Sequence, residues 1–154
     1  MNKMDERQES LLAATIASFF SILAFTITSL FNNFILVKFL IFNSKYINIF
    51  DLHWWLSSEL VLFSGFLFGV TYRYIIRDDN DFQLKAGGVM AFGLVRGLVQ
   101  VDTSVVLSDI NNLLWEALYA VLLLAENIFL FGVAALGLDY AIRLGWVKPF
   151  KRLN

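Results

Sequence analysis

The sequence predicts an all-α integral membrane protein, with four transmembrane helices and an interfacial segment between the first and the second. Composition is the first reason: 58% of the residues are hydrophobic and 16% are charged, whereas soluble domains average roughly 45–50% and about 25%. The second reason is a set of four apolar runs, and the third is a biased placement of lysine and arginine between them. A chain of 154 residues cannot bury so much apolar side chain in a soluble core. We therefore expect the excess to face lipid in a single transmembrane domain, residues 1–154.

The first apolar run, residues 11–31, contains no charged residue. Its length matches the roughly 20 residues that cross the hydrocarbon layer as a helix. The residues before it are more acidic than basic, unlike the basic start of a secretory signal. We predict an uncleaved anchor, whose serine and threonine side chains lie within roughly one 160° arc and pack against other helices.

Residues 34–55 form the predicted interfacial segment. Asn32–Asn33 separates it from the first span, and its apolar stretch at 34–42 is too short to cross a membrane and carries Lys38. Aromatic residues dominate the rest of the segment. Because amphipathic rings prefer the boundary between lipid and water, we expect this segment to lie along the membrane surface.

Three further spans are predicted at about residues 56–76, 86–101 and 113–138. The span at 86–101 is the shortest, and it contains four glycines and Arg96. A re-entrant or strongly buried helix is the alternative for this stretch, because it is shorter than an ordinary crossing.

The placement of lysine and arginine distinguishes these alternatives. With four crossings, nine of these residues lie on one side of the membrane and two, Lys38 and Lys45, lie on the other. The nine are Lys3, Arg7, Arg73, Arg77, Lys85, Arg143, Lys148, Lys151 and Arg152. Since basic residues concentrate on the cytoplasmic side, the bias predicts four crossings with both termini on the cytoplasmic or stromal side. A re-entrant third segment would divide the nine between the two sides.

Two GxxxG spacings occur, at Gly65 and Gly69 in the second span and at Gly93 and Gly97 in the third. Glycines four residues apart form a flat strip on a helix, which lets another backbone approach closely. We expect these glycines to pack helices within the bundle. A docking face for a partner protein is the alternative.

Four ionisable side chains are expected at membrane depth: Glu59, Arg96, Glu116 and Glu126. Counting along alternating helices places the first three in one layer and Glu126 about 15 Å deeper, near the midplane. A lone charge there costs at least about 2.5–3.5 kcal/mol, so pairing is expected. We predict a clasp in which Arg96 bridges Glu59 or Glu116. In the alternative, Glu126 and Asn127 form a proton or cation relay with Arg96 as its electrostatic partner.

Few residues suit catalysis or cofactor binding. The sequence has no cysteine and one histidine, His53, which excludes thiolate chemistry and a multi-histidine metal site. The acidic turn Arg77–Asp81 lacks the glycine and distal glutamate of a calcium loop and is interpreted as a solvated turn. His53 is expected to be an interfacial polar residue, with ligation of a magnesium-centred pigment as the alternative. Recognised catalytic motifs are missing, and a net charge of -1 does not attract nucleic acid. We expect no enzyme, no cofactor, no metal site and no nucleic-acid partner.

Several short motifs lie between residues 56 and 150. They are Phe68–Tyr74, Arg77, Gln83–Lys85, Ala91–Leu98, Glu126–Asn127, Leu138–Asp139 and Gly145–Phe150. Together they resemble motifs of a family of small integral membrane proteins of cyanobacteria and plastids. The resemblance implies a thylakoid or cyanobacterial inner-membrane location and an auxiliary role beside photosynthetic complexes. It implies no reaction, and residues 1–50 do not contribute to it.

These features favour a non-enzymatic membrane accessory protein: an assembly, stability or peripheral subunit of a larger membrane complex. That the complex is photosynthetic is implied by the resemblance alone. The packing glycines and the aromatic segment suit contact with a partner protein. The alternative is a small homo-oligomeric transporter or channel element that uses Glu126 and Arg96. It requires several copies, because four helices with one acid near the midplane make a poor pore alone.

Overall fold

The computed structural model describes the chain at residues 3–39, 52–76, 81–105 and 113–148, and within these ranges it describes the side chains except those of residues 3, 5, 32–39, 53, 103–105 and 113–116. The secondary structure of the described residues consists of four α-helices. They are α1 (Lys3–Phe39), α2 (Leu52–Ile75), α3 (Phe82–Val105) and α4 (Leu113–Arg143).

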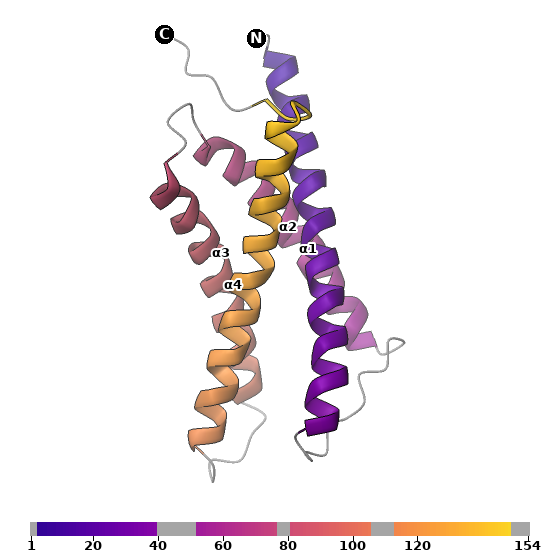
Figure 1. Cartoon of the computed structure of the whole chain (residues 1–154), viewed down its shortest axis with the longest axis vertical. Helices are drawn as coiled ribbons and strands as arrows, with labels where there is room; N and C mark the ends of the chain where they lie inside the picture. Colours follow the sequence, from indigo (N-terminus) through magenta and orange to yellow (C-terminus); the bar gives the residue numbers. More distant parts are fainter. Residues whose placement is uncertain (1–2, 40–51, 77–80, 106–112, 149–154) are drawn as a thin grey trace.

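Each helix contains a segment long and apolar enough to cross a membrane. These segments are Glu6–Phe31, Trp54–Ile75, Phe82–Asp102 and Ala117–Arg143. The helices alternate in direction, so that α1 begins and α4 ends at one end of the bundle, which we call the termini end (Figure 1). α1 ends and α4 begins at the opposite end, which we call the far end. The predicted fold class is confirmed: the chain is an all-α integral membrane protein.

α1 is longer than the sequence predicted. The expected break at Asn32–Asn33 is absent, and the helix continues to Phe39. α2 already begins at Leu52, so the described ends of the predicted interfacial segment are helical. Asparagine disfavours a helix interior by only about 0.7 kcal/mol, which neighbouring turns readily offset. The remainder of that segment, residues 40–51, lies outside the described residues.

α3 is also longer than the predicted span at 86–101, because it begins at Phe82 and continues to Val105. Asp81 caps its start: the Asp81 Oδ1 atom accepts a hydrogen bond of 3.1 Å from the Gln83 N–H. Lys85, which immediately precedes the predicted span, lies inside the helix and pairs with Asp139 of α4. A continuous helix that runs from the termini end to the far end replaces the re-entrant alternative (Figure 1).

α1 and α2 form the first of two helical hairpins, and small residues bring their backbones together. A Cβ atom at Gly69 would lie 2.6 Å from the Ala13 carbonyl oxygen and 2.7 Å from the Ala14 Cα atom. At Gly65 it would lie 2.6 Å from the Ser21 Oγ atom. Such close approach gains dispersion contacts that lipid tails do not supply.

α3 and α4 form the second hairpin in the same way. A Cβ atom at Gly93 would lie 2.8 Å from the Ile128 Cα atom, and one at Gly97 would lie 2.8 Å from the Leu124 side chain. Both glycine pairs therefore face a neighbouring helix of the same chain. The two hairpins meet mainly where α1 packs on α4, with the Phe20 ring lying over Gly137.

An aromatic cluster fills the middle of the bundle. The rings of Phe68, Phe92 and Phe131 come from α2, α3 and α4, and their centroids lie between 5.1 and 5.6 Å apart. Tyr72 stacks on Phe68 at 5.1 Å. These rings join both hairpins in one apolar core.

The chain turns sharply after α4. Gly145 has φ of 75°, its N–H donates to the Ile142 carbonyl at 3.0 Å, and the Trp146 N–H donates to the Ala141 carbonyl at 3.0 Å. This pair of bonds is a Schellman motif, which favours glycine because of the positive φ. The turn directs Val147 back into the core, where its side chain is 1% exposed.

Candidate functional site

Polar side chains from three helices meet around Arg96 in the span of α3. The Arg96 Nη1 atom donates a hydrogen bond of 3.2 Å to the Ser64 hydroxyl of α2, and Ser64 donates in turn to the Val61 carbonyl at 3.1 Å. The carboxylate of Glu126 on α4 attracts the Arg96 charge. We call Ser64, Arg96, Gln100, Glu126 and Asn127 the mid-membrane cluster.

Asn127 and Gln100 complete this cluster. The Asn127 side chain is 2% exposed, and its Nδ2 group donates to the Gln100 Oε1 atom at 2.7 Å and to the Leu123 carbonyl at 2.8 Å. Both amide protons are therefore used within the bundle. Two atoms of this region are buried without a hydrogen-bond partner in the described part of the chain: Arg96 Nε and the hydroxyl of Ser21 on α1.

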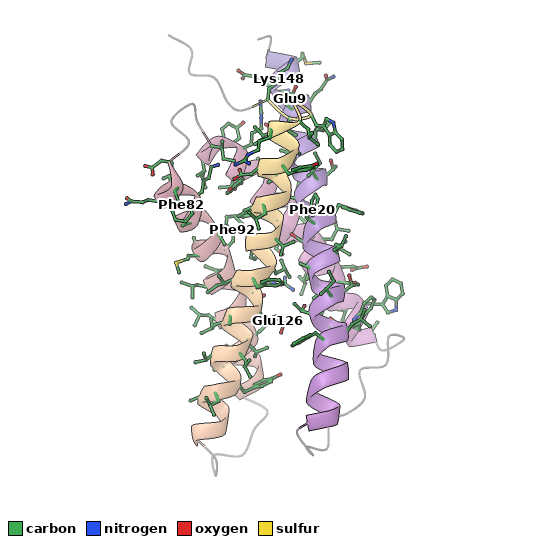
Figure 2. All side chains as sticks on the ribbon, viewed as in Figure 1. Glu9, Phe20, Phe82, Phe92, Glu126 and Lys148 are labelled. Atoms are coloured by element: carbon green, nitrogen blue, oxygen red, sulfur yellow. The ribbon has the colours of Figure 1, made fainter. Side chains whose placement is uncertain are left out.

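The cluster lies well inside the hydrocarbon layer. The exposed rings of Tyr119 and Tyr140 on α4 are 21 residues apart, about 31 Å along a helix, which matches the thickness of that layer. Glu126 is seven residues from Tyr119, so it lies about 10 Å from the far boundary. Figure 2 accordingly shows Glu126 in the middle part of the bundle.

The predicted charge cluster is only partly assembled. Arg96 and Glu126 interact across α3 and α4. Glu59 lies on the exposed face of α2, and no ion pair involving it occurs among the described side chains. Glu116 belongs to α4, but its side chain lies outside the described ones. The structure thus directs Arg96 towards Ser64 and Glu126, and away from the predicted bridge to Glu59.

A second polar group lies at the termini end and centres on Arg73, which is 1% exposed. Its Nη1 atom donates to the Glu6 carbonyl at 2.8 Å and to the Ser10 hydroxyl, and its Nε atom donates to the Lys148 carbonyl at 3.1 Å. The Lys148 N–H donates to Glu9 Oε2 at 2.9 Å, and Figure 2 shows these two residues together at this end. We call these five residues the Arg73 junction.

Lys85, Asp139 and Tyr72 tie α3 to α4 and α2 at the same end. The Lys85 ammonium lies 3.0 and 3.1 Å from the two Asp139 carboxylate oxygens, and the Tyr72 hydroxyl donates to Asp139 at 3.4 Å. This ion pair and the Arg73 junction together involve all four helices. Polar interactions at this end therefore link the four helices to one another.

Sequence reasoning did not identify the Arg73 junction as a site. Tyr72 and Asp139 entered only as residues that carry the family resemblance, and Arg73, Lys85 and Lys148 entered through that resemblance and the charge bias. It also overlooked Gln100, although Gln100 follows Arg96 by four residues and so shares its helix face. The Arg73 contacts have no comparable signal, because they are largely with backbone carbonyls of distant segments.

The arrangement can pair charges and exchange hydrogen bonds within the membrane. Among the described residues, no three His, Asp or Glu side chains lie close enough to hold a metal ion. Comparisons with protein-family models, curated proteins and solved structures each return no match. The fold and the two polar groups define the class: a four-helix integral membrane protein with a hydrogen-bonded arginine in one span.

Proposed function

We propose that this chain is a non-enzymatic accessory protein of a larger membrane complex, acting in its assembly or stability or as a peripheral subunit. The observation that carries the proposal is that aromatic rings and mutually bonded polar side chains occupy the interior of the bundle. Phe68, Phe92 and Phe131 fill the centre between the two polar groups. The polar side chains of the mid-membrane cluster bond to one another across α2, α3 and α4. An interior of this kind suits a protein that acts through its outer surface.

The outer surface of α3 supports the same proposal. α3 packs along α4 and touches α2 only briefly, so most of its span is uncovered. Its exposed side chains are large and apolar, at Met90, Leu94, Val95, Leu98 and Val99. Such a face can be covered by acyl chains or by a transmembrane helix of a partner. A peripheral subunit requires a face of this type.

The photosynthetic setting is a proposal that rests on the family resemblance. The residues that carry it include Tyr72, Arg73, Lys85 and Asp139, which tie the helices together at the termini end. We propose a thylakoid or cyanobacterial inner-membrane location, with this end on the cytoplasmic or stromal side. The excess of basic residues predicted on that side supports this orientation.

Affinity purification after gentle detergent extraction tests the accessory role. We expect the tagged chain to migrate in a large complex on a native gel and to retain specific membrane proteins at constant stoichiometry. Recovery of the chain alone, or as a discrete homo-oligomer, would contradict the proposal. An unrelated four-helix membrane protein with the same tag is the control for adventitious co-purification.

A homo-oligomeric transporter element is the second candidate, because Glu126 and Arg96 interact about 10 Å inside the hydrocarbon layer. Substitution Glu126→Gln removes the carboxyl group that could bind and release a proton, and it preserves the size of the side chain. Under the transport hypothesis the variant accumulates normally, but ion or proton flux into proteoliposomes is lost. Under the accessory hypothesis the same variant retains its partner complex.

A further inference from the structure

The backbone of Lys148 connects both helical hairpins at the termini end. Its N–H donates to Glu9 of α1 at 2.9 Å, and its carbonyl accepts from Arg73 of α2 at 3.1 Å. Residues 144–148, which we call the strap, continue directly from α4 of the other hairpin. Val147 anchors the strap in the core. The strap therefore holds the first hairpin to the second through backbone groups, and the Lys148 side chain itself is exposed.

Arg73 stabilises the strap through its hydrogen bond to the Lys148 carbonyl. A guanidinium that is 1% exposed has lost its hydration, so its burial is costly unless hydrogen-bond acceptors replace the lost water. Two of its bonded acceptors belong to α1 and the third is the Lys148 carbonyl. Its Nη2 atom is buried without a hydrogen-bond partner among the described groups. Loss of the strap would leave a second nitrogen, Nε, without its acceptor.

The described side chains pack closely at the termini end and in the middle of the bundle. Among them, the last buried residue of α1 is Ala24, and the first buried residues of α2 and α4 are Val61 and Asn127. The described side chains of these three helices that lie nearer the far end are partly or fully exposed. Figure 1 shows α1 and α4 together at the termini end and apart at the far end.

We propose that the strap controls the conformation of the bundle. By holding the two hairpins together at the termini end, it sets the distance between them at the far end. The termini end, with the strap, Arg73 and the contact of Phe20 with Gly137, then acts as the pivot. Among the described residues near the far end, no side-chain hydrogen bond or ion pair comparable to those of the strap joins the two hairpins. This inference depends on the fold and not on the accessory function, so each can be tested without the other.

Distance measurement between spin labels in lipid nanodiscs tests the proposal on the full chain. The chain has no cysteine, so introduced thiols are unique labelling sites. Phe31→Cys with Leu118→Cys reports the far end, and Leu11→Cys with Tyr140→Cys reports the termini end; all four positions are exposed. The strap is weakened by Glu9→Ala, which removes the acceptor of the Lys148 N–H, and by Arg73→Met, which removes the donor to its carbonyl.

The matched controls keep the strap bonds. Glu9→Gln retains an oxygen acceptor, and Lys148→Ala retains both backbone groups. We expect Glu9→Ala and Arg73→Met to lengthen and broaden the distance at the far end, and both controls to leave it unchanged. Thiol reactivity at Val147→Cys, a buried position, reports whether the strap has been released.

A released strap with an unchanged far-end distance would overturn the proposal. A far-end change that Lys148→Ala also produces would overturn it as well, because the backbone bonds would then not be responsible. If Arg73→Met does not accumulate, Glu9→Ala decides the outcome, since Glu9 lies at the surface of the termini end and its loss leaves the apolar core intact.

Discussion

At the scale of single residues, Arg96 shows how this protein retains a charge inside the membrane. An arginine at the centre of a helix costs at least about 2.5–3.5 kcal/mol to insert. Its Nη1 atom bonds to Ser64, and Glu126 supplies the opposite charge. Side chains of α2, α3 and α4 therefore surround this one partly buried charge. Removing one member of a charge pair leaves the other uncompensated.

Substitution Arg96→Met should destabilise the protein. Breaking a buried pair costs about 3–5 kcal/mol in soluble cores, and the cost should be smaller here because Arg96 and Glu126 are only partly buried. The midpoint of unfolding in denaturing detergent, together with accumulation in the membrane, measures the loss. The double variant Arg96→Met with Glu126→Gln should recover much of it.

Glu59→Gln is the control for this experiment, because Glu59 lies on the exposed face of α2. It should change stability little and should not rescue Arg96→Met. If Glu59→Gln rescued Arg96→Met and Glu126→Gln did not, the result would support the Arg96–Glu59 bridge that the sequence predicted. Normal stability of Arg96→Met would exclude a structural role for the pair.

Counting along the helices placed Arg96 and Glu126 within apolar spans, and both residues lie in such segments of the structure. The same count placed them about 15 Å apart in depth, whereas the structure brings them close enough to interact. Which side chains meet depends on the rotation of each helix about its axis, which follows from packing elsewhere. Gly93 against Ile128 and Gly97 against Leu124 fix the rotation of α3, and this brings Gln100 to Asn127. The contact between Gln100 and Asn127 could therefore not be predicted from the sequence alone.

At the scale of helices, small residues determine which elements pair. In lipid, helices gain little from apolar side chains as such, so close backbone packing provides the stabilisation. Ala13, Ala14 and Ala17 are fully buried against Gly69. The predicted arc of hydroxyls on α1 includes Ser18 and Ser21, which are buried on this interface. The alanines that form most of it carried no polar signal and were not predicted.

Substitution Gly93→Leu should separate α3 from α4. Its Cβ atom would lie 2.8 Å from the Ile128 Cα atom and 3.1 Å from the Ile128 nitrogen, so the backbone itself must move. Overpacking of this kind typically costs about 1–3 kcal/mol. We expect a lower unfolding midpoint and less folded protein.

Gly87→Leu is the matched control on the same helix, because a Cβ atom at Gly87 meets nothing within 4 Å. It should leave the unfolding midpoint unchanged or raise it slightly, since leucine favours a helix over glycine. Equal losses at positions 87 and 93 would show that the helix interface is not the cause. Loss of a partner complex with an intact monomer at position 93 would instead favour the docking-face alternative.

At the scale of the whole molecule, the bundle is asymmetric from end to end. The Lys85–Asp139 ion pair, the Schellman turn and the Arg73 junction all lie at the termini end. The four apolar runs and the alternating direction of the helices could be predicted, because length and composition determine them. The asymmetry could not, because it depends on Lys148 meeting Glu9, a contact between residues 139 positions apart in the chain.

The last prediction concerns the orientation of the whole molecule in the membrane. Helices α1 and α3 begin at the termini end, and α2 and α4 finish there (Figure 1). Nine of the lysines and arginines are predicted on that side and two on the other. Because basic residues favour the cytoplasmic side, reporter tags at residue 1, at residue 80 and at residue 154 should all be protected from a probe added to the opposite side. A tag after residue 105 should be accessible to that probe. Opposite results for the tags at 80 and 154 would require an odd number of crossings between them, which the paired helices α3 and α4 do not permit.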